Sequence, residues 1–431
     1  MVKIILKEHT LLVLYLAVLF LISIGLLNDS GTNYIFPFFI YCFFFVFSYF
    51  VFKWLYNQNS SSFSKFNYSF IFNNFLSEEK LKYIAILLFL ITVSFIAIHL
   101  VIIGHIPFIT ALKSYDYYGI SLIRQSISDH ENVFIKYISS FSVKALIPFL
   151  LLFFYLKNKK MFLILFVISI FYCISLMQKS LVVSILIPLI IFNIFQFQFK
   201  MSLLFSFISV LSVFFLVFVT NPSLRASKEE IQQETTIENH KNHIPEEIFE
   251  RSTNSLSGSD KSIIDSIISA IRGIYTRVIV VPGKVVSMWF KYVPDKFPYS
   301  QGCGYRFLAP FLGCEFENYN YSRFIYDFEN PMDVKEGMKG TANVASFMND
   351  YSNFGVLGLI LAGIILAIFF NMVEILFENN FKWLITLNLL FIVWLSSSAF
   401  FTTLFSGGWG LTLVLFFLFK RALSSSTVKA H

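Results

Sequence analysis

The sequence predicts an all-α polytopic membrane protein of about ten transmembrane helices with one large external loop. Hydrophobic residues make up 56% of its 431 residues, charged residues make up only 14%, and 56 residues are Phe. A soluble domain has too little interior for so much apolar surface, because even large domains leave about a quarter of their unfolded-chain surface exposed. The apolar residues also gather in runs of about 20, which is the length that crosses a bilayer core. Lipid offers no hydrogen bonds to bare backbone, so such runs must be helices.

The apolar runs give the order of the expected helices. Lys3 and Lys7 precede the first run as they would in a signal peptide, but Asn28-Asp29-Ser30 follows it instead of a small-residue cleavage site, so we expect a helix there. Residues 1–220 then hold seven helices, 221–352 form the loop, and 353–431 hold three helices and a tail. The expected spans are 10–27, 34–52, 83–103, 138–156, 161–178, 180–198, 202–220, 353–377, 382–399 and 402–419.

Basic residues predict the orientation of these helices. Both chain ends and the segments on their side are rich in Lys and Arg, for example Lys157, Lys159 and Lys160. The short segments on the other side hold only Lys113, Arg124, Lys136, Lys144 and Lys179. The positive-inside rule therefore places both termini in the cytoplasm and the long loop outside. The net charge of +7 is explained by this topology, and we expect no nucleic-acid partner.

The long loop divides into two parts. Residues 221–261 are rich in Glu, Gln, Asn and Ser, and we expect a mobile insertion there. From residue 262 onward, apolar residues from Ile264 to Val278 recur at helical spacing, which predicts an amphipathic helix that Pro282 ends or kinks. An irregular stretch dense in aromatic residues is expected at 297–330. Cys303 and Cys314 both fall in this loop, and their spacing leaves open whether they form a disulfide.

Three groups of external residues are candidates for chemistry. The first is a set of cations, which either contact lipid headgroups or bind an anion such as pyrophosphate, since Arg donates two parallel hydrogen bonds. The second is the stretch from Glu315 to Asp327, whose Tyr residues could stack on a sugar or simply form the core of the loop. The candidate cations are Lys179, Arg272, Arg277, Arg306 and Arg323.

The third group lies at the start of the eighth expected helix. Asn343, Ser346 and Asp350 are spaced to share one face, and Gly355, Gly358 and Ala362 form a small-residue stripe beside it. Asp350 is either a carboxylate at the helix mouth or a partly buried general base with a raised pKa.

Other classes of function find little support in the sequence. His105, His130, His240 and His243 show no metal-ligand spacing, so no metal site is predicted. The sequence also lacks a Gly-rich phosphate loop and a serine-hydrolase elbow. Within the expected spans, His99, Lys144 and Glu374 are the clear ionisable residues, and snorkelling explains the last two. Ion-coupled transporters place carboxylates and broken helices at mid-membrane, so their absence from the sequence pattern disfavours transport.

On this evidence the chain resembles the O-antigen polymerase (Wzy-type) family, within the polymerase and ligase group of GT-C-like glycosyltransferases. The features that carry the resemblance are the helix plan, the large loop and the stretch Asn349-Asp350-Tyr351-Ser352-Asn353-Phe354-Gly355-Val356-Leu357-Gly358, which looks like an acidic-Tyr-x-x-Phe-Gly-x-x-Gly signature. Phe297-Pro298-Tyr299 through Gly304-Tyr305 and Met177-Gln178-Lys179-Ser180 are also similar. Many relatives carry Arg where this chain has Lys179.

The resemblance implies a glycosyltransferase of lipopolysaccharide biosynthesis in the bacterial inner membrane, with the large loop periplasmic. It would join undecaprenyl-pyrophosphate-linked repeat units into a polysaccharide without a cofactor, and a chain-length regulator is a candidate partner. The resemblance assigns Lys179, Arg272, Arg277 and Arg306 to the pyrophosphate, with Asp350 as first and Asp327 as second candidate base. Arg323, Asn343, Tyr351 and Tyr321 are further substrate-binding candidates. The alternatives are an O-antigen ligase, which transfers glycan to lipid A core, and a lipid-linked glycan transporter without chemistry.

Overall fold

The computed structural model describes residues 8–63, 77–104, 106–114, 117–128, 133–221, 272–273, 275–335, 337–377 and 380–427. These residues form helices and connecting turns, with no strand among them. Six helical segments are long and apolar enough to cross a membrane: Thr10–Ser30, Ile35–Gln58, Glu78–Lys113, Tyr137–Lys157, Phe199–Thr220 and Val356–Phe377. Two shorter apolar helices are Lys179–Phe195 and Phe381–Trp394. The chain is therefore an α-helical membrane protein.

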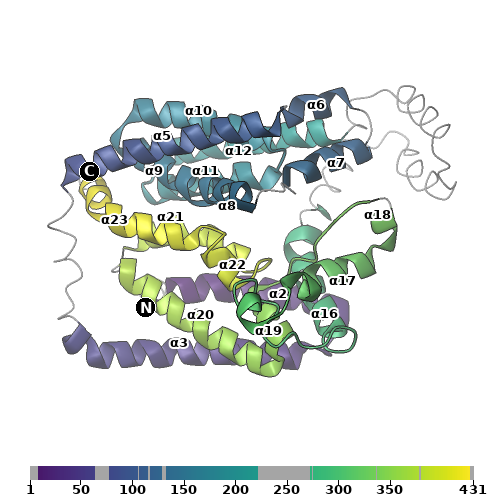
Figure 1. The fold of residues 1–431 in the computed structure, drawn as a ribbon. Coiled ribbons are helices and arrows are strands. Elements are labelled where there is room, and N and C mark those ends of the chain that lie inside the picture. Colours follow the sequence, from purple (N-terminus) through teal and green to yellow (C-terminus); the bar gives the residue numbers. More distant parts are fainter. Residues whose placement is uncertain are drawn as a thin grey trace, which may run out of the picture.

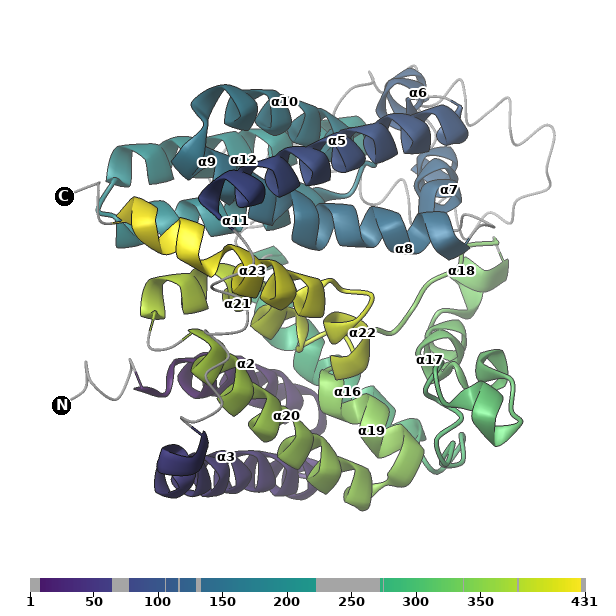
Figure 2. The same cartoon turned by 60° about the vertical axis from the view of Figure 1, so that its left-hand side comes forward.

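The helices form two groups with a third group between them (Figures 1 and 2). The described chain begins and ends at one end of the bundle, and the helices of the long loop lie at the opposite end, here called the loop end. The first group consists of α2 (Thr10–Ser30), α3 (Ile35–Phe63) and α20 (Val356–Phe377). The second consists of α5 (Glu78–Ile103), α6 (Pro107–Lys113), α7 (Tyr117–Ser128), α8 (Val133–Phe141), α9 (Ile147–Lys157), α10 (Lys159–Ser175), α11 (Lys179–Phe195) and α12 (Phe199–Thr220).

Between these groups lie α21 (Phe381–Trp394), α22 (Phe400–Leu404) and α23 (Trp409–Thr427). The sequence predicted two continuous helices here, at 382–399 and 402–419, and the structure corrects both. α21 ends at Trp394 before the run Ser396-Ser397-Ser398, whose side chains compete for backbone hydrogen bonds. The second break contains Gly407 and Gly408, and Gly408 has φ +86°, which favours glycine. Broken helices, which the sequence did not predict, are therefore present beside the candidate site.

The long loop begins its described part with a π-helix, Thr276–Val280, followed by α16 (Val281–Tyr292). Pro282 does not end the helical segment, because the π-helix runs directly into α16 and Pro282 lies in the first turn of α16. α16 packs on the loop end of α2 through two glycines: a Cβ on Gly283 would lie 2.1 Å from the Leu26 amide nitrogen. Gly25 makes the matching close approach, with Ile279 O at 2.4 Å from its own would-be Cβ. Residues 222–271, including most of the expected mobile insertion, lie outside the described residues.

The rest of the loop is only partly irregular. Turns and short 3-10 helices cover much of 297–320, as predicted, and α17 (Tyr321–Glu329) and α18 (Pro331–Lys335) are helical. Cys303 and Cys314 form a disulfide, which decides the question that their spacing left open.

The chain then returns to the bundle as an extended segment, 341–345, and leaves it as α19 (Ser346–Phe354). Two contacts hold the inner end of this turn: the Trp289 indole donates to Ala342 O at 3.1 Å, and the Ser346 amide donates to Leu395 O at 2.8 Å. Gly355, with φ +63°, turns the chain from α19 into α20. A Cβ on Gly358 would lie 2.0 Å from Asp350 O, so the predicted small-residue stripe does allow a close approach, here by α19 itself.

The three intramembrane ionisable residues all have partners inside the protein. His99 Nδ1 lies 2.6 Å from the Tyr172 hydroxyl. Glu374 accepts from the Leu11 amide at 3.1 Å and lies 3.6 Å from Lys53 Nζ. Lys144 lies in a π-helix, Ser142–Leu146, with its ammonium 5.0 Å from the Trp394 ring centroid. Glu374 and Lys144 thus have partners within the protein that the sequence did not predict, and their snorkelling stays a prediction.

Candidate functional site

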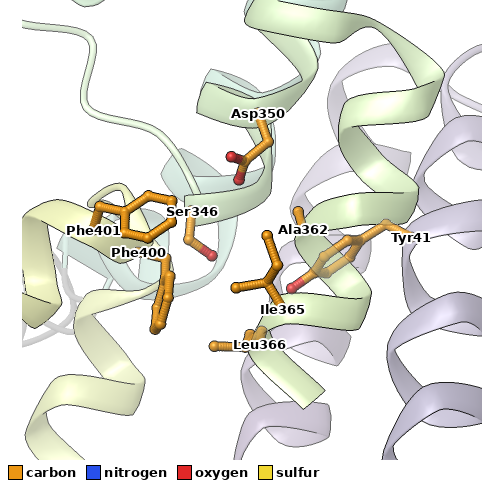
Figure 3. Close-up of a pocket in the computed structure, with 8 residues that line it drawn as sticks. All are labelled: Tyr41, Ser346, Asp350, Ala362, Ile365, Leu366, Phe400 and Phe401. Carbon is orange, nitrogen blue, oxygen red and sulfur yellow. The ribbon is translucent and has the colours of Figure 1, made fainter. Parts of the chain in front are cut away.

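A small cavity lies where α3, α19, α20 and α22 meet (Figure 3). The centre of a water-sized sphere can occupy about 10 Å³ of it. Its polar lining comes from Tyr41, Ser346 and Asp350, and all three oxygen-bearing side chains point toward the cavity in Figure 3. Its apolar lining is Ala362, Ile365, Leu366, Phe400 and Phe401. Because Ala362 is six residues into α20, the cavity lies about 9 Å below the loop end of that helix.

Asp350 is the one carboxylate in this lining, and it is almost fully buried, with 9% of its surface exposed. Its Oδ1 accepts a hydrogen bond from the Tyr305 hydroxyl. Burial raises the pKa of Asp350 to about 7, although the hydrogen bond from Tyr305 opposes that rise. A carboxylate with this pKa is well matched to accept a proton at neutral pH.

Three hydroxyl groups lie beside Asp350. The Tyr15 hydroxyl is 2.8 Å from the Tyr41 hydroxyl and 3.3 Å from Ser346 Oγ. Tyr15 and Tyr41 have no exposed surface, and Ser346 is 2% exposed. Ser346 and Asp350 therefore share one face, as their spacing predicted. Asn343 does not join them, because it precedes α19 in the extended segment, where its exposed side chain meets Ser322.

Asn353 holds the Tyr305 loop in place. Its Oδ1 accepts from the Gly302 amide at 3.0 Å, the Gly304 amide at 3.1 Å and the Ser300 hydroxyl at 2.6 Å. Its own amide group donates to Asn349 O at 2.7 Å, so one side chain joins this loop to α19. The Cys303–Cys314 disulfide closes the same loop covalently. Together these contacts bring Tyr305 to Asp350 from 45 residues away in the chain.

The candidate cations divide into a cluster around Lys179 and two Arg residues that pair with carboxylates elsewhere in the loop. Arg124 of α7 and Arg277 of the π-helix that precedes α16 lie within electrostatic range of the Lys179 ammonium at the start of α11. Like charges repel, so holding three cations together is favourable when an anion lies among them. Arg272 is exposed close by in the sequence.

Arg306 and Arg323 have partners in the loop. Arg306 lies 3.4 Å from Glu317, and its guanidinium covers the Phe316 ring. Arg323 lies 3.6 Å from Asp327 one helical turn later, on the exposed side of α17. Asp327 is thus a partly exposed, paired carboxylate, and it lacks the nearly complete burial that makes Asp350 a candidate base.

Two predicted substrate-binding tyrosines make structural hydrogen bonds. The Tyr321 hydroxyl donates to Pro298 O. The Tyr351 hydroxyl donates to Val293 O at 3.2 Å. Both rings are buried, so they form part of the core of the loop, which was the alternative explanation for the aromatic stretch.

Sequence reasoning gave no individual site role to Tyr15, Tyr41, Tyr305 and Asn353, which lie around Asp350, or to Arg124, whose charge acts on Lys179. Tyr15 and Tyr41 carried a weak signal, since each places a hydroxyl group within a mostly apolar span. Among the described residues, no three or more His, Cys, Asp or Glu side chains are placed to hold a metal ion. His105, His130, His240 and His243 lie outside those residues.

No protein-family model matches this chain, and neither a curated protein nor a solved structure is significantly similar to it.

Proposed function

We propose that this protein is a glycosyltransferase that polymerises undecaprenyl-pyrophosphate-linked oligosaccharide repeat units into O-antigen or a related surface polysaccharide. The observation that carries the proposal is Asp350, a buried carboxylate with a pKa of about 7 near the loop end of an apolar helical bundle. A lipid-linked donor is already activated, so the reaction needs an acceptor for one proton and charge stabilisation for one leaving group.

In the proposed reaction, Asp350 removes the proton of the attacking sugar hydroxyl. The oxygen of that hydroxyl forms a bond to the anomeric carbon of the donor. The bond from that carbon to the pyrophosphate oxygen breaks, and the electron pair leaves with the lipid pyrophosphate. Negative charge thus passes from the carboxylate to the leaving group, and atoms and charge balance without a cofactor.

The cluster of Lys179, Arg124 and Arg277 is the proposed position of the pyrophosphate. Its cations stabilise the charge that develops on the leaving group, which is commonly the largest electrostatic contribution to such a reaction. Arg277 is exposed and lies in the segment packed on α2, close to the apolar surface along which a lipid tail would approach. In this proposal the loop end faces the periplasm of the bacterial inner membrane, and both chain ends are cytoplasmic. The chain crosses the membrane about ten times, with α10, α11, α21 and α23 completing the crossings.

The test is an Arg277→Ala variant expressed in the source bacterium after deletion of its own gene. We expect the variant to insert normally and to leave lipopolysaccharide with a single repeat unit in place of the ladder of lengths. Lys291→Ala is the matched control, because it removes a charge from the same helical segment about 20 Å away and should keep the ladder. If Arg277→Ala makes polysaccharide of wild-type chain length, Arg277 does not belong to the proposed pyrophosphate site.

The transporter alternative gains one observation from the structure. Segment 341–345 enters the bundle and returns as α19, and α21 stops at Trp394, so broken backbone surrounds a buried carboxylate. The gene deletion separates the functions. Loss of a transporter leaves single units inside the cell, and loss of a ligase accumulates long lipid-linked glycan. Loss of a polymerase leaves single units attached to lipid A core.

A further inference from the structure

The cavity beside Asp350 has the size and lining of a site for one water molecule. A water needs about 10–15 Å³ for its centre and two to four polar partners, and an apolar cavity of the same size stays empty. Here the volume is about 10 Å³, and the carboxylate, the Ser346 hydroxyl and the Tyr41 hydroxyl all border it (Figure 3). Tyr305 occupies Oδ1 of Asp350 from outside the cavity lining, so the carboxylate still has lone pairs to offer.

We propose that one water molecule occupies this cavity and bridges Asp350, Ser346 and Tyr41, and that Ser346 and Tyr41 are positioning residues that act on Asp350 through this water. The Tyr15 hydroxyl completes the group by joining Ser346 to Tyr41. The water site itself follows from the cavity, whereas its bearing on proton removal rests on the proposed function.

Counting hydrogens shows which form of Asp350 this group favours. The three hydroxyls and the water carry five hydrogens. Five contacts join the group: Tyr15 contacts Tyr41 and Ser346, and the water contacts Asp350, Ser346 and Tyr41. When Asp350 is ionised and accepts from the water, each contact holds one of the five hydrogens. A protonated Asp350 brings a sixth hydrogen, for which the group has no sixth contact. The hydroxyls therefore stabilise the carboxylate and oppose the effect of burial on its pKa.

Among the described residues, Asp350 and Tyr41 are the titratable groups that line the cavity. The described walls from α20 and α22 are apolar, namely Ala362, Ile365, Leu366, Phe400 and Phe401. Tyr305 from the loop, Tyr15 from α2 and Cys42 from α3 are the further titratable neighbours, and Tyr and Cys side chains are ordinarily protonated at neutral pH.

The test is an infrared pH titration of the purified full-length protein in nanodiscs without substrate. The carboxylic-acid C=O band that disappears in Asp350→Asn reports the protonation of Asp350. In Ser346→Ala and Tyr41→Phe we expect its midpoint to rise by about one pH unit, a tenfold fall in the acid dissociation constant, because each loses one hydroxyl of the group. Ser352→Ala is the control: its hydroxyl bonds to Asn349 O on the same helix and lies outside the cavity lining, so the midpoint should not move.

A second variant tests the water without removing any hydroxyl. Ala362→Val adds two carbons to the cavity wall and should expel the water, raise the midpoint and abolish a water O–D stretching band, measured in D₂O, that shifts in D₂¹⁸O. Equal midpoints in wild type, Ser346→Ala and Tyr41→Phe overturn the proposal. A shift in Ser346→Ala without one in Ala362→Val also overturns it, because Ser346 would then act directly. These readouts need no substrate, so normal polysaccharide from Asp350→Asn would refute only the proposed function.

Discussion

Asp350→Asn is expected to make the stability of the protein less dependent on pH. The amide has the shape of the carboxyl group and keeps an oxygen that can accept from Tyr305, but it cannot ionise. In the wild type, burial raises the pKa of Asp350 from 3.8 to about 7. The folded protein therefore binds this proton more tightly than the unfolded chain does.

The sign and size of the effect follow from this shift. A raised pKa contributes stability that is fully present below pH 4 and is lost as the pH rises to about 7. The whole shift corresponds to about 4 kcal/mol, at 1.36 kcal/mol per unit. Two of the three units lie between pH 5 and pH 7, so the wild type should lose about 3 kcal/mol relative to Asp350→Asn between pH 5 and pH 8. Above pH 8 the difference should stay constant.

Thermal unfolding in a mild detergent, measured for both proteins from pH 4 to pH 9, checks this prediction. The difference between the two midpoints should change between pH 4 and pH 7 and then level off. Asp333→Asn is a useful control, because Asp333 accepts from Tyr326 in the loop away from the cavity, and the substitution should not remove the slope. Parallel curves for wild type and Asp350→Asn would refute the reasoning, since Asp350 would then titrate alike in the folded and unfolded states.

Three further predictions concern the elements that place the site. Replacing Cys303 and Cys314 together by Ser should cost about 3 kcal/mol of stability, seen as a lower melting temperature that reductant no longer changes. Gly283→Ala should cost about 3 kcal/mol, because its Cβ would overlap the backbone of α2, whereas Gly273→Ala meets nothing within 4 Å and should melt as the wild type does. Asn353→Ala should cost about 2 kcal/mol of stability and speed hydrogen exchange at the Gly302 and Gly304 amides, which donate to the Asn353 oxygen. Unchanged exchange at these amides would show that Asn353 does not hold the loop.

The sequence predicted the features that depend on local pattern. Apolar runs placed α2, α5 and α12 within a few residues, because the length of a spanning helix is set by the bilayer. The spacing of Ser346 and Asp350 placed both on one face, because helical periodicity holds wherever a helix forms. The apolar pattern gave a wrong prediction after Trp394, where the composition stays apolar but serines and glycines interrupt the helix.

Contacts between distant segments were beyond the reach of the sequence. The bond from Tyr305 to Asp350 depends on the path of the loop, which Asn353 and the disulfide determine together. Lys144 looked like a residue at a helix end, whereas packing against Trp394 retains it within the bundle. In both cases the partner comes from a distant segment, and hydrophobic periodicity gives no information about where that segment lies.

The polar groups of α2, α3 and α20 also bear on whether the protein performs chemistry or transport. Asp350 and its hydroxyls lie toward the loop end, while Glu374, Tyr49 and Lys53 form a second group toward the other end. Between the groups, the rings of Phe45 and Phe370 pack edge-on against Tyr15, and neither ring has exposed surface. A proton cannot pass along aromatic rings that carry no exchangeable hydrogen, so this arrangement separates the two groups. We therefore predict that Asp350 exchanges its proton on the side of the loop, which is what the proposed function requires.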